Sequence, residues 1–374
     1  MNPRRVPIQC IVPPHILREV AQRGTPGQRA WALQTLSASD RLRGRREALA
    51  LLATAAPSAG QKRRTIFDAQ NGQELPGALV RGETDPATAD PAVNEAFEGS
   101  GATYDFYQEI FGRNSIDDHG MRLDSTVHFD QNMDNAFWDG RQMVYGDGDG
   151  TLFERFTKAI DVIGHELTHG VTQTEAGLIY SGQPGALNES ISDVFGSLLK
   201  QKVANQTADQ ADWLIGAGLF TKNVKGVALR SLKAPGTAYD DPVLGKDPQP
   251  ANMKDFQKVS FDNGGVHINS GIPNHAFFLV AKEIGGKAWE KAGRIWYIAL
   301  RDRLRRRSNF QQAADITFQV AGDLFGSGSS EQKAVRNGWL GVGINVKQPV
   351  LFETSRLGPV SYKETEKAER AKVS

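Results

Sequence analysis

Apolar residues recur at three- and four-residue intervals through most of the second half of the chain, between Leu152 and Leu340. This spacing places them on one face of an α-helix and is typical of helices packed against a core. It predicts helices over residues 159–175, 185–203, 275–284, 288–304, 311–325 and 329–342. We therefore expect this half of the protein to be mainly helical.

The first half changes character along its length. Helical spacing is present over residues 15–22, 28–36 and 40–52. A small, polar, proline-broken stretch follows at 53–64 and is typical of a linker. Beyond it, short alternating segments flank an Asn-Gly turn and indicate β-structure, with a helix predicted over 91–111 and a strand over 122–128.

The composition excludes several classes of protein. With 374 residues, 39% hydrophobic and 23% charged, the chain can bury a sizeable core, which excludes a mainly disordered or fibrous protein. No run of about 18 apolar residues is present, so no membrane-spanning helix is expected. The single cysteine, Cys10, excludes an intramolecular disulfide framework and a multi-cysteine zinc site. The first residues lack the clean apolar stretch of a secretory signal, so we expect cytoplasmic synthesis and any export by a non-classical route.

The net charge of +1 conceals an uneven distribution. Residues 1–64 contain 12 Lys and Arg against 3 Asp and Glu, a balance of +9, which leaves −8 for the rest of the chain. A basic head can bind nucleic acid, but this one has no aromatic interleaving, zinc-finger spacing or glycine-rich stacking motif. We prefer the interpretation that the head docks on the acidic body, with no nucleic-acid or membrane partner.

The sequence His-Glu-Leu-Thr-His at 165–169 lies inside one of the predicted helices. His165 and His169 are four residues apart, so both imidazoles project from the same side of the helix and can bind one zinc ion. Glu166 lies on the neighbouring stripe, where it can reach a metal-bound water. The motif therefore predicts two ligands and a general base.

A catalytic zinc ion needs a third protein ligand and one open position. Glu189 is the candidate for the third ligand, and Asp193 lies four residues after it on the next predicted helix. Glu189 can bind the metal, while Asp193 accepts the ring N–H of a ligand histidine and fixes its tautomer. The alternative is a non-catalytic, zinc-stabilised binding protein, which would not need Glu166 because that residue is not a ligand.

Four segments resemble the thermolysin family of zinc endopeptidases: HELTH, GLIYSGQPGALNESISDVFG, FDNGGVHINSGIPNHAF and NAFWDGRQMVYGDGDG. The basic head with its Pro13-Pro14 is similar to the short pro-segment of the protealysin-like subgroup. The resemblance implies an α+β, two-lobed fold, with a β-rich N-terminal lobe, a mainly helical C-terminal lobe and the active-site helix between them. The divisions expected are a pro-segment at 1–60 with a linker to about 64, lobes at 65–158 and 159–346, and a flexible tail at 347–374.

The resemblance also assigns chemical roles. The zinc ligands would be His165, His169 and Glu189. Glu166 would move the proton of the attacking water to the leaving amine. His267 and Tyr180 would donate hydrogen bonds to the developing oxyanion. Asp262 would orient His267.

For the substrate, the resemblance implies an edge strand and an apolar pocket. Asn135 and Ala136 would bind the main chain of an extended peptide, and Arg230 would hold the carbonyl just past the scissile bond. The pocket residues, each of which could equally be a core residue, would be Phe153, Phe156, Val162, Ile215, Leu219 and Leu229. Together they imply an endopeptidase that cleaves on the N-terminal side of bulky hydrophobic residues.

The chain departs from the family at the paired calcium site. Asp161 and Asp212 match that site, but Lys200, Leu214 and Ala217 stand at its other positions. Calcium needs six or more oxygen ligands, and a lysine in the cage opposes it. We therefore expect one zinc ion and no paired calcium site.

The head predicts a self-inhibited precursor, released by cleavage near residues 53–64. Cys10 could bind the zinc ion as a latency switch, or it could be a small buried hydrophobic residue. The partners expected are a peptide or protein substrate and the chain's own pro-segment. The protein is expected to be a monomer.

Overall fold

The computed structural model describes residues 9–49 and 61–347. Most of the expected linker and nearly all of the expected flexible tail lie outside the described residues. A mixed six-stranded sheet with the order β1-β5-β6-β4-β2-β3 forms the first lobe. Its strands are β1 (Gln9–Cys10), β2 (Arg64–Asp68), β3 (Ala78–Arg81), β4 (Leu123–Val127), β5 (Ala136–Trp138) and β6 (Gln142–Tyr145). β2, β4 and β6 are parallel, and the remaining pairs are antiparallel.

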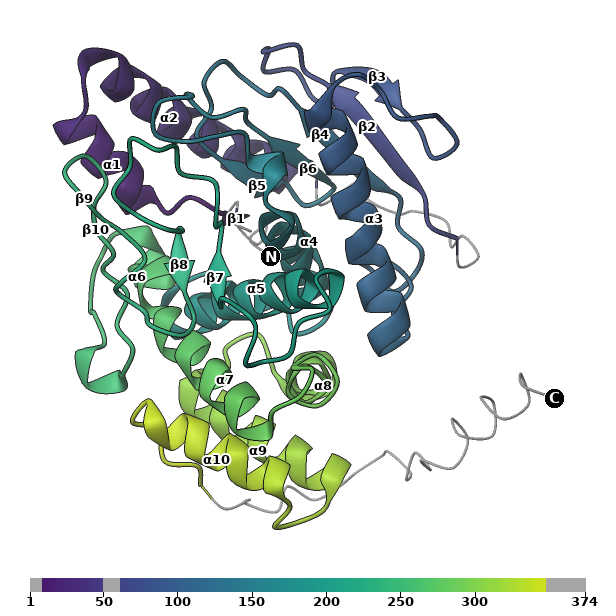
Figure 1. Ribbon diagram of the computed structural model, residues 1–374, viewed down its shortest axis with the longest axis vertical. Coiled ribbons are helices and arrows are strands. Elements are labelled where there is room, and N and C mark those ends of the chain that lie inside the picture. The colour runs from purple at the N-terminus through teal and green to yellow at the C-terminus, as the bar shows by residue number, and fades with distance from the viewer. Residues whose placement is uncertain (1–8, 50–60, 348–374) are drawn as a thin grey trace.

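The helix α3 (Pro91–Phe111) packs against this sheet (Figure 1). Asp90 starts it, because its side chain accepts the backbone N–H of Ala92, and Pro91 suits the first helical position since it has no N–H to lose. Gly112 ends it with a φ of 69°, a left-handed conformation that favours glycine. The predicted helix at 91–111 is therefore confirmed.

The second lobe is mainly helical, as predicted. Its longer helices are α4 (Ile160–Thr174), α5 (Gly182–Val203), α6 (Asp262–Asn269), α7 (Gly271–Ile284), α8 (Ala292–Ile298), α9 (Phe310–Phe325) and α10 (Ser330–Gly341). Two short antiparallel pairs join them: β7 (Leu214–Ile215) with β8 (Arg230–Ser231), and β9 (Asp240–Asp241) with β10 (Gly245–Lys246). Within the described residues, no helix is both long and apolar enough to cross a membrane.

Two helix predictions need correction. Residues 28–36 and 40–52 were expected as separate helices, but one continuous helix, α2 (Pro26–Leu49), covers most of both. The Ser-Ala-Ser sequence between them contains no proline or glycine to end a helix. The helix expected over 288–304 begins only at Ala292 and closes with a π-helical turn at Ala299–Arg303.

Helices α4 and α5 lie between the sheet lobe and the helices of the second lobe (Figure 1). They approach closely because α5 carries Gly196 at the crossing. A Cβ atom there would lie 2.4 Å from the carbonyl oxygen of Asp161 and 3.2 Å from the backbone nitrogen of His165. Any larger residue would push α5 away from the helix that carries both histidines.

The head forms β1, then the short helix α1 (Pro14–Arg23), then α2, and lies against both lobes. Five apolar side chains between β1 and the end of α1 are almost fully buried: Ile11, Val12, Ile16, Leu17 and Val20 are each no more than 1% exposed. The described side chains of residues 9–39 make no ion pair with either lobe, so in this part docking depends on apolar burial and on hydrogen bonds from the main chain and from side chains such as Gln34, rather than on ion pairs.

Candidate active site

The two histidines of the HELTH motif direct their Nε2 atoms at each other, 3.0 Å apart. The Nδ1 atom of His165 lies 2.8 Å from a carboxylate oxygen of Asp193, and that of His169 lies 2.8 Å from the amide oxygen of Asn188. Both of these oxygens can only accept, so each Nδ1 atom is the donor, and this tautomer of a neutral ring presents a lone pair on Nε2. Two lone pairs that face each other in a buried site call for a cation between them.

Glu189 completes this arrangement from α5. Its Oε2 atom is 3.5 Å from His165 Nε2, and its Oε1 atom is 3.5 Å from His169 Nε2. All three side chains are fully buried, and Glu189 Oε2 has no hydrogen-bond partner among the described residues. A buried carboxylate beside two imidazole nitrogens is a donor set that fits zinc, so the structure suits the expected metal.

Glu166 belongs to the same cluster, because its carboxylate lies within 4.8 Å of ligand atoms of both histidines. Its Oε2 atom accepts the backbone N–H of Trp138 on β5 at 3.0 Å. This contact holds the carboxylate between α4 and β5.

Asp193 connects the histidines to Arg230. It accepts the Nδ1 proton of His165, two bonds from the Arg230 guanidinium at 2.9 Å each, and the amide N–H of Asn274 at 2.8 Å. Burial alone would raise the pKa of this carboxyl, but Arg230 and His165 hold it well below its usual range. Asp193 is therefore an ionised carboxylate that orients both the candidate ligand His165 and the cation of Arg230.

A second group of residues faces the cluster from α6. Its first turn is left-handed, with φ values of 85° at Gly264 and 77° at Gly265, which glycine tolerates. This turn brings Asp262 within 2.5 Å of His267 Nδ1. Burial alone would lower the pKa of His267, but the charges of Asp262 and Glu189 raise it to about 9.

Tyr180 lies between the two groups. Its hydroxyl donates to Glu189 and lies 3.1 Å from His267 Nε2. Burial and the charge of Glu189 raise its pKa well above the usual value, so the hydroxyl keeps its proton.

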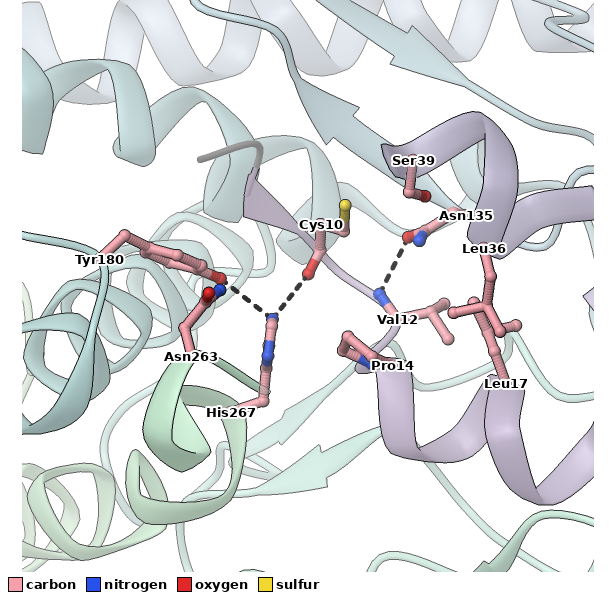
Figure 2. Close-up of a pocket in the computed structure, with 10 residues that line it drawn as sticks. All are labelled: Cys10, Val12, Pro14, Leu17, Leu36, Ser39, Asn135, Tyr180, Asn263 and His267. Carbon is pink, nitrogen blue, oxygen red and sulfur yellow. Dashed lines mark hydrogen bonds between the residues drawn. The ribbon is translucent and has the colours of Figure 1, made fainter. Parts of the chain in front are cut away.

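The head crosses this site as an extended strand (Figure 2). The carbonyl oxygen of Cys10 accepts from His267 Nε2 at 3.0 Å, and that of Ile11 accepts from Arg230 at 2.8 Å. The N–H of Val12 donates to the side chain of Asn135 at 3.0 Å, and the N–H of Ile11 donates to the carbonyl of Ala136 at 3.1 Å.

The six residues expected to form an apolar pocket are all buried, none more than 1% exposed, and belong to the same apolar cluster as Ile11. Cys10 has a different environment. Its thiol points away from its carbonyl oxygen (Figure 2) and packs among Phe129, Met133, Phe137 and Val144. The structure therefore favours the buried-hydrophobe interpretation of Cys10 over a zinc ligand.

Three polar residues of the site were not anticipated from the sequence: Asn188, Ser192 and Asn274. The first two could have been found, because Asn188 precedes Glu189 directly and Ser192 lies one turn later on the same helix, where its hydroxyl is 2.9 Å from His169 Nδ1. Asn274 could not, since it is 81 residues from Asp193 in the chain.

Comparison with known proteins gives consistent matches. Residues 56–173 match the model for the thermolysin metallopeptidase catalytic domain, and residues 176–344 that for its alpha-helical domain. The chain is 50% identical to an "Extracellular metalloprotease" from Pectobacterium carotovorum subsp. carotovorum, over 92% of this chain and 99% of that protein. It is 54% identical to "Protease PrtS" from Photorhabdus sp. (strain Az29), over 76% of this chain and 77% of that one.

A solved structure resembles most of the chain. The precursor of protealysin, a metalloproteinase from Serratia proteamaculans, superimposes with a TM-score of 0.83 at 50% identity, covering 90% of this chain and 99% of that one. The two-lobed α+β architecture expected from the sequence is thereby confirmed. The chain belongs to the thermolysin family of metallopeptidases and is a zinc-dependent endopeptidase with a precursor form.

Proposed function

We propose that His165, His169 and Glu189 hold the zinc ion of this endopeptidase. One observation carries the proposal: the Nε2 atoms of His165 and His169 lie 3.0 Å apart, and each lies 3.5 Å from the buried carboxylate of Glu189. Zinc supplies Lewis-acid chemistry there, since it polarises a carbonyl group and makes a water molecule more acidic. The remaining chemistry belongs to the side chains around it.

Glu166 accepts the proton of the attacking water and passes it to the leaving amine. Its position supports this role, because the Trp138 N–H fixes the carboxylate beside the edge strand on which an extended peptide binds. His267 and Tyr180 donate to the oxygen on which negative charge develops. Asp262 keeps the imidazole of His267 protonated and oriented toward that oxygen.

We propose that the enzyme cleaves before bulky apolar residues. Ile11 of the head makes the contacts that a substrate residue after the scissile bond would make: its carbonyl meets Arg230 and its side chain is buried in an apolar cluster. A charged side chain in that position would lose its hydration without gaining a partner.

The same contacts support the proposal that the head inhibits the precursor. Residues 1–60 act as pro-segment, followed by lobes at 65–158 and 159–346, and the head covers both the edge strand and the oxyanion donors. Substrate binding therefore requires the head to leave. The chain acts as a monomer on peptide or protein substrates, and, since two relatives carry "extracellular" in their names, we propose that it acts outside the cell.

The role of Glu166 is tested with Glu166→Gln. We expect kcat for an external peptide with leucine after the scissile bond to fall about 10²–10⁴-fold, because the amide cannot accept a proton. Metal analysis should still find one zinc ion per chain. The head of the variant is removed beforehand with tagged wild-type enzyme, which is then withdrawn.

The matched control is His165→Ala, which should lose zinc and activity together. Full hydrolysis by zinc-loaded Glu166→Gln would exclude Glu166 as the proton acceptor.

A further inference from the structure

The peptide bond between Cys10 and Ile11 lies across the active site in the orientation of a substrate. The head strand β1 runs antiparallel to β5, with Cys10 opposite Phe137. The N–H of Ile11 donates to the carbonyl of Ala136, which continues the pairing beyond the strand. An added edge strand of this kind is a common way for a protein to bind an extended peptide.

The carbonyl groups on the two sides of this bond have different partners. The carbonyl of Cys10 meets His267 Nε2 (Figure 2), which lies 3.6 Å from the carboxylate of Glu189. The carbonyl of Ile11 is bound by Arg230, and the Ile11 side chain is fully buried. The Cys10 carbonyl is therefore the one presented to the catalytic groups, and the nitrogen of Ile11 is in the leaving position.

We propose that the enzyme cuts its own chain between Cys10 and Ile11, in addition to removing the head within residues 53–64. The proposal rests on the proposed function. One water molecule is consumed: its hydroxyl bonds to the carbonyl carbon of Cys10, the C–N bond breaks, and the nitrogen of Ile11 takes a proton. The products are a carboxylate on Cys10 and an amine on Ile11, with no oxidation or reduction.

The cut is slow and precedes release of the head. Both new ends are still held by the contacts described, so the amine remains in place to re-form the bond. On the C-terminal side of the cut, Ile11 is followed by Val12, Ile16 and Leu17, each at most 1% exposed. We therefore expect α1 and α2 to stay docked after the cut.

The experiment follows the purified, zinc-loaded full chain by intact mass and N-terminal sequencing, with hydrolysis of an external peptide measured in parallel. We expect a chain that begins at Ile11 and a peptide that ends at Cys10, produced by a first-order process whose half-time is unchanged on about 100-fold dilution, because the reaction is intramolecular. Glu166→Gln should give neither product.

Two variants separate this site from general processing. Ile11→Asp should slow the cut on the order of 10²-fold, because a carboxylate must enter the apolar cluster. Ile16→Val, a conservative change of a buried isoleucine elsewhere in the head, should leave the rate within about threefold. If the external peptide is hydrolysed and the head is removed within 53–64 without any chain that begins at Ile11, the proposal is wrong. If neither the external peptide nor the chain itself is cut, the proposed function fails instead.

Discussion

The most informative single residue outside the catalytic cluster is His15, at the second position of α1. Its Nε2 atom lies 3.1 Å from the hydroxyl of Tyr239, and its Nδ1 atom is shielded from solvent with no hydrogen-bond partner among the described residues. A protonated imidazole would bring two N–H groups, and only one would find an acceptor. Burial lowers the pKa of His15 to about 4, and the charged groups that act on it are Asp262, which opposes the shift, and His267, Arg230 and Arg18, which add to it.

Acid should therefore weaken docking of the head. A released head regains the ordinary histidine pKa of 6.5, so it binds a proton that the docked head rejects. The contribution of His15 to this loss is absent above pH 6.5, grows as the pH falls toward 4, and changes no further below that. At most, titration of His15 lowers the equilibrium constant for docking about 300-fold.

The measurement uses Glu166→Gln, which cannot process itself, and competition between the head and a hydroxamate inhibitor of the active site. Comparison with His15→Gln at each pH cancels the pH dependence of the inhibitor and of the lobes. The glutamine can still bond Tyr239 but cannot titrate. A ratio between the two proteins that stays constant from pH 7.5 to 4.5 would contradict the expectation.

At the scale of elements, Lys200 ties two helices and a strand together. From α5, its ammonium lies 2.8 Å from Asp161 on α4, 3.0 Å from Asp212 and 2.6 Å from the carbonyl of Leu214 on β7. Burial would lower the pKa of this lysine, but Asp161 and Asp212 raise it, so the ammonium keeps its charge. The position of this cation between the two carboxylates supports our proposal that the paired calcium site is absent.

Lys200→Met should lower the free energy of unfolding by about 2–4 kcal/mol, because Asp161 is only 2% exposed and would lose its counter-charge. Lys202→Met is the matched control two residues away. Its lysine pairs with an exposed glutamate, so the change should cost less than about 1 kcal/mol. Chemical denaturation measures both. Added calcium should leave the unfolding midpoint of the wild type unchanged, and a rise would argue for a calcium site.

At the scale of the whole molecule, the sequence predicts what depends on local spacing. Four-residue spacing places His165 beside His169, and the long periodic segments of the second lobe predict its helices. Contacts between distant segments leave no such pattern. The register of the head against β5, the bond from Asn274 to Asp193 and the reach of Lys200 to Leu214 each depend on tertiary packing. The charge imbalance indicated that the head docks, but not that apolar burial and hydrogen bonds, rather than ion pairs, would hold residues 9–39.

The head also joins the two lobes, because β1 pairs with β5 in the first lobe while Arg230 and His267 bind it from the second. Its removal should therefore lower the thermal midpoint of Glu166→Gln by about 5–10 °C, equivalent to a few kcal/mol of buried apolar surface. Calorimetry of the variant before and after removal of the head measures this. In the intact variant, Leu17→Asn should reproduce most of the loss, since Leu17 is 1% exposed, whereas Arg23→Ala should not, since Arg23 only pairs with Glu19 at the surface. Equal midpoints with and without the head would mean that it covers the site without holding the lobes together.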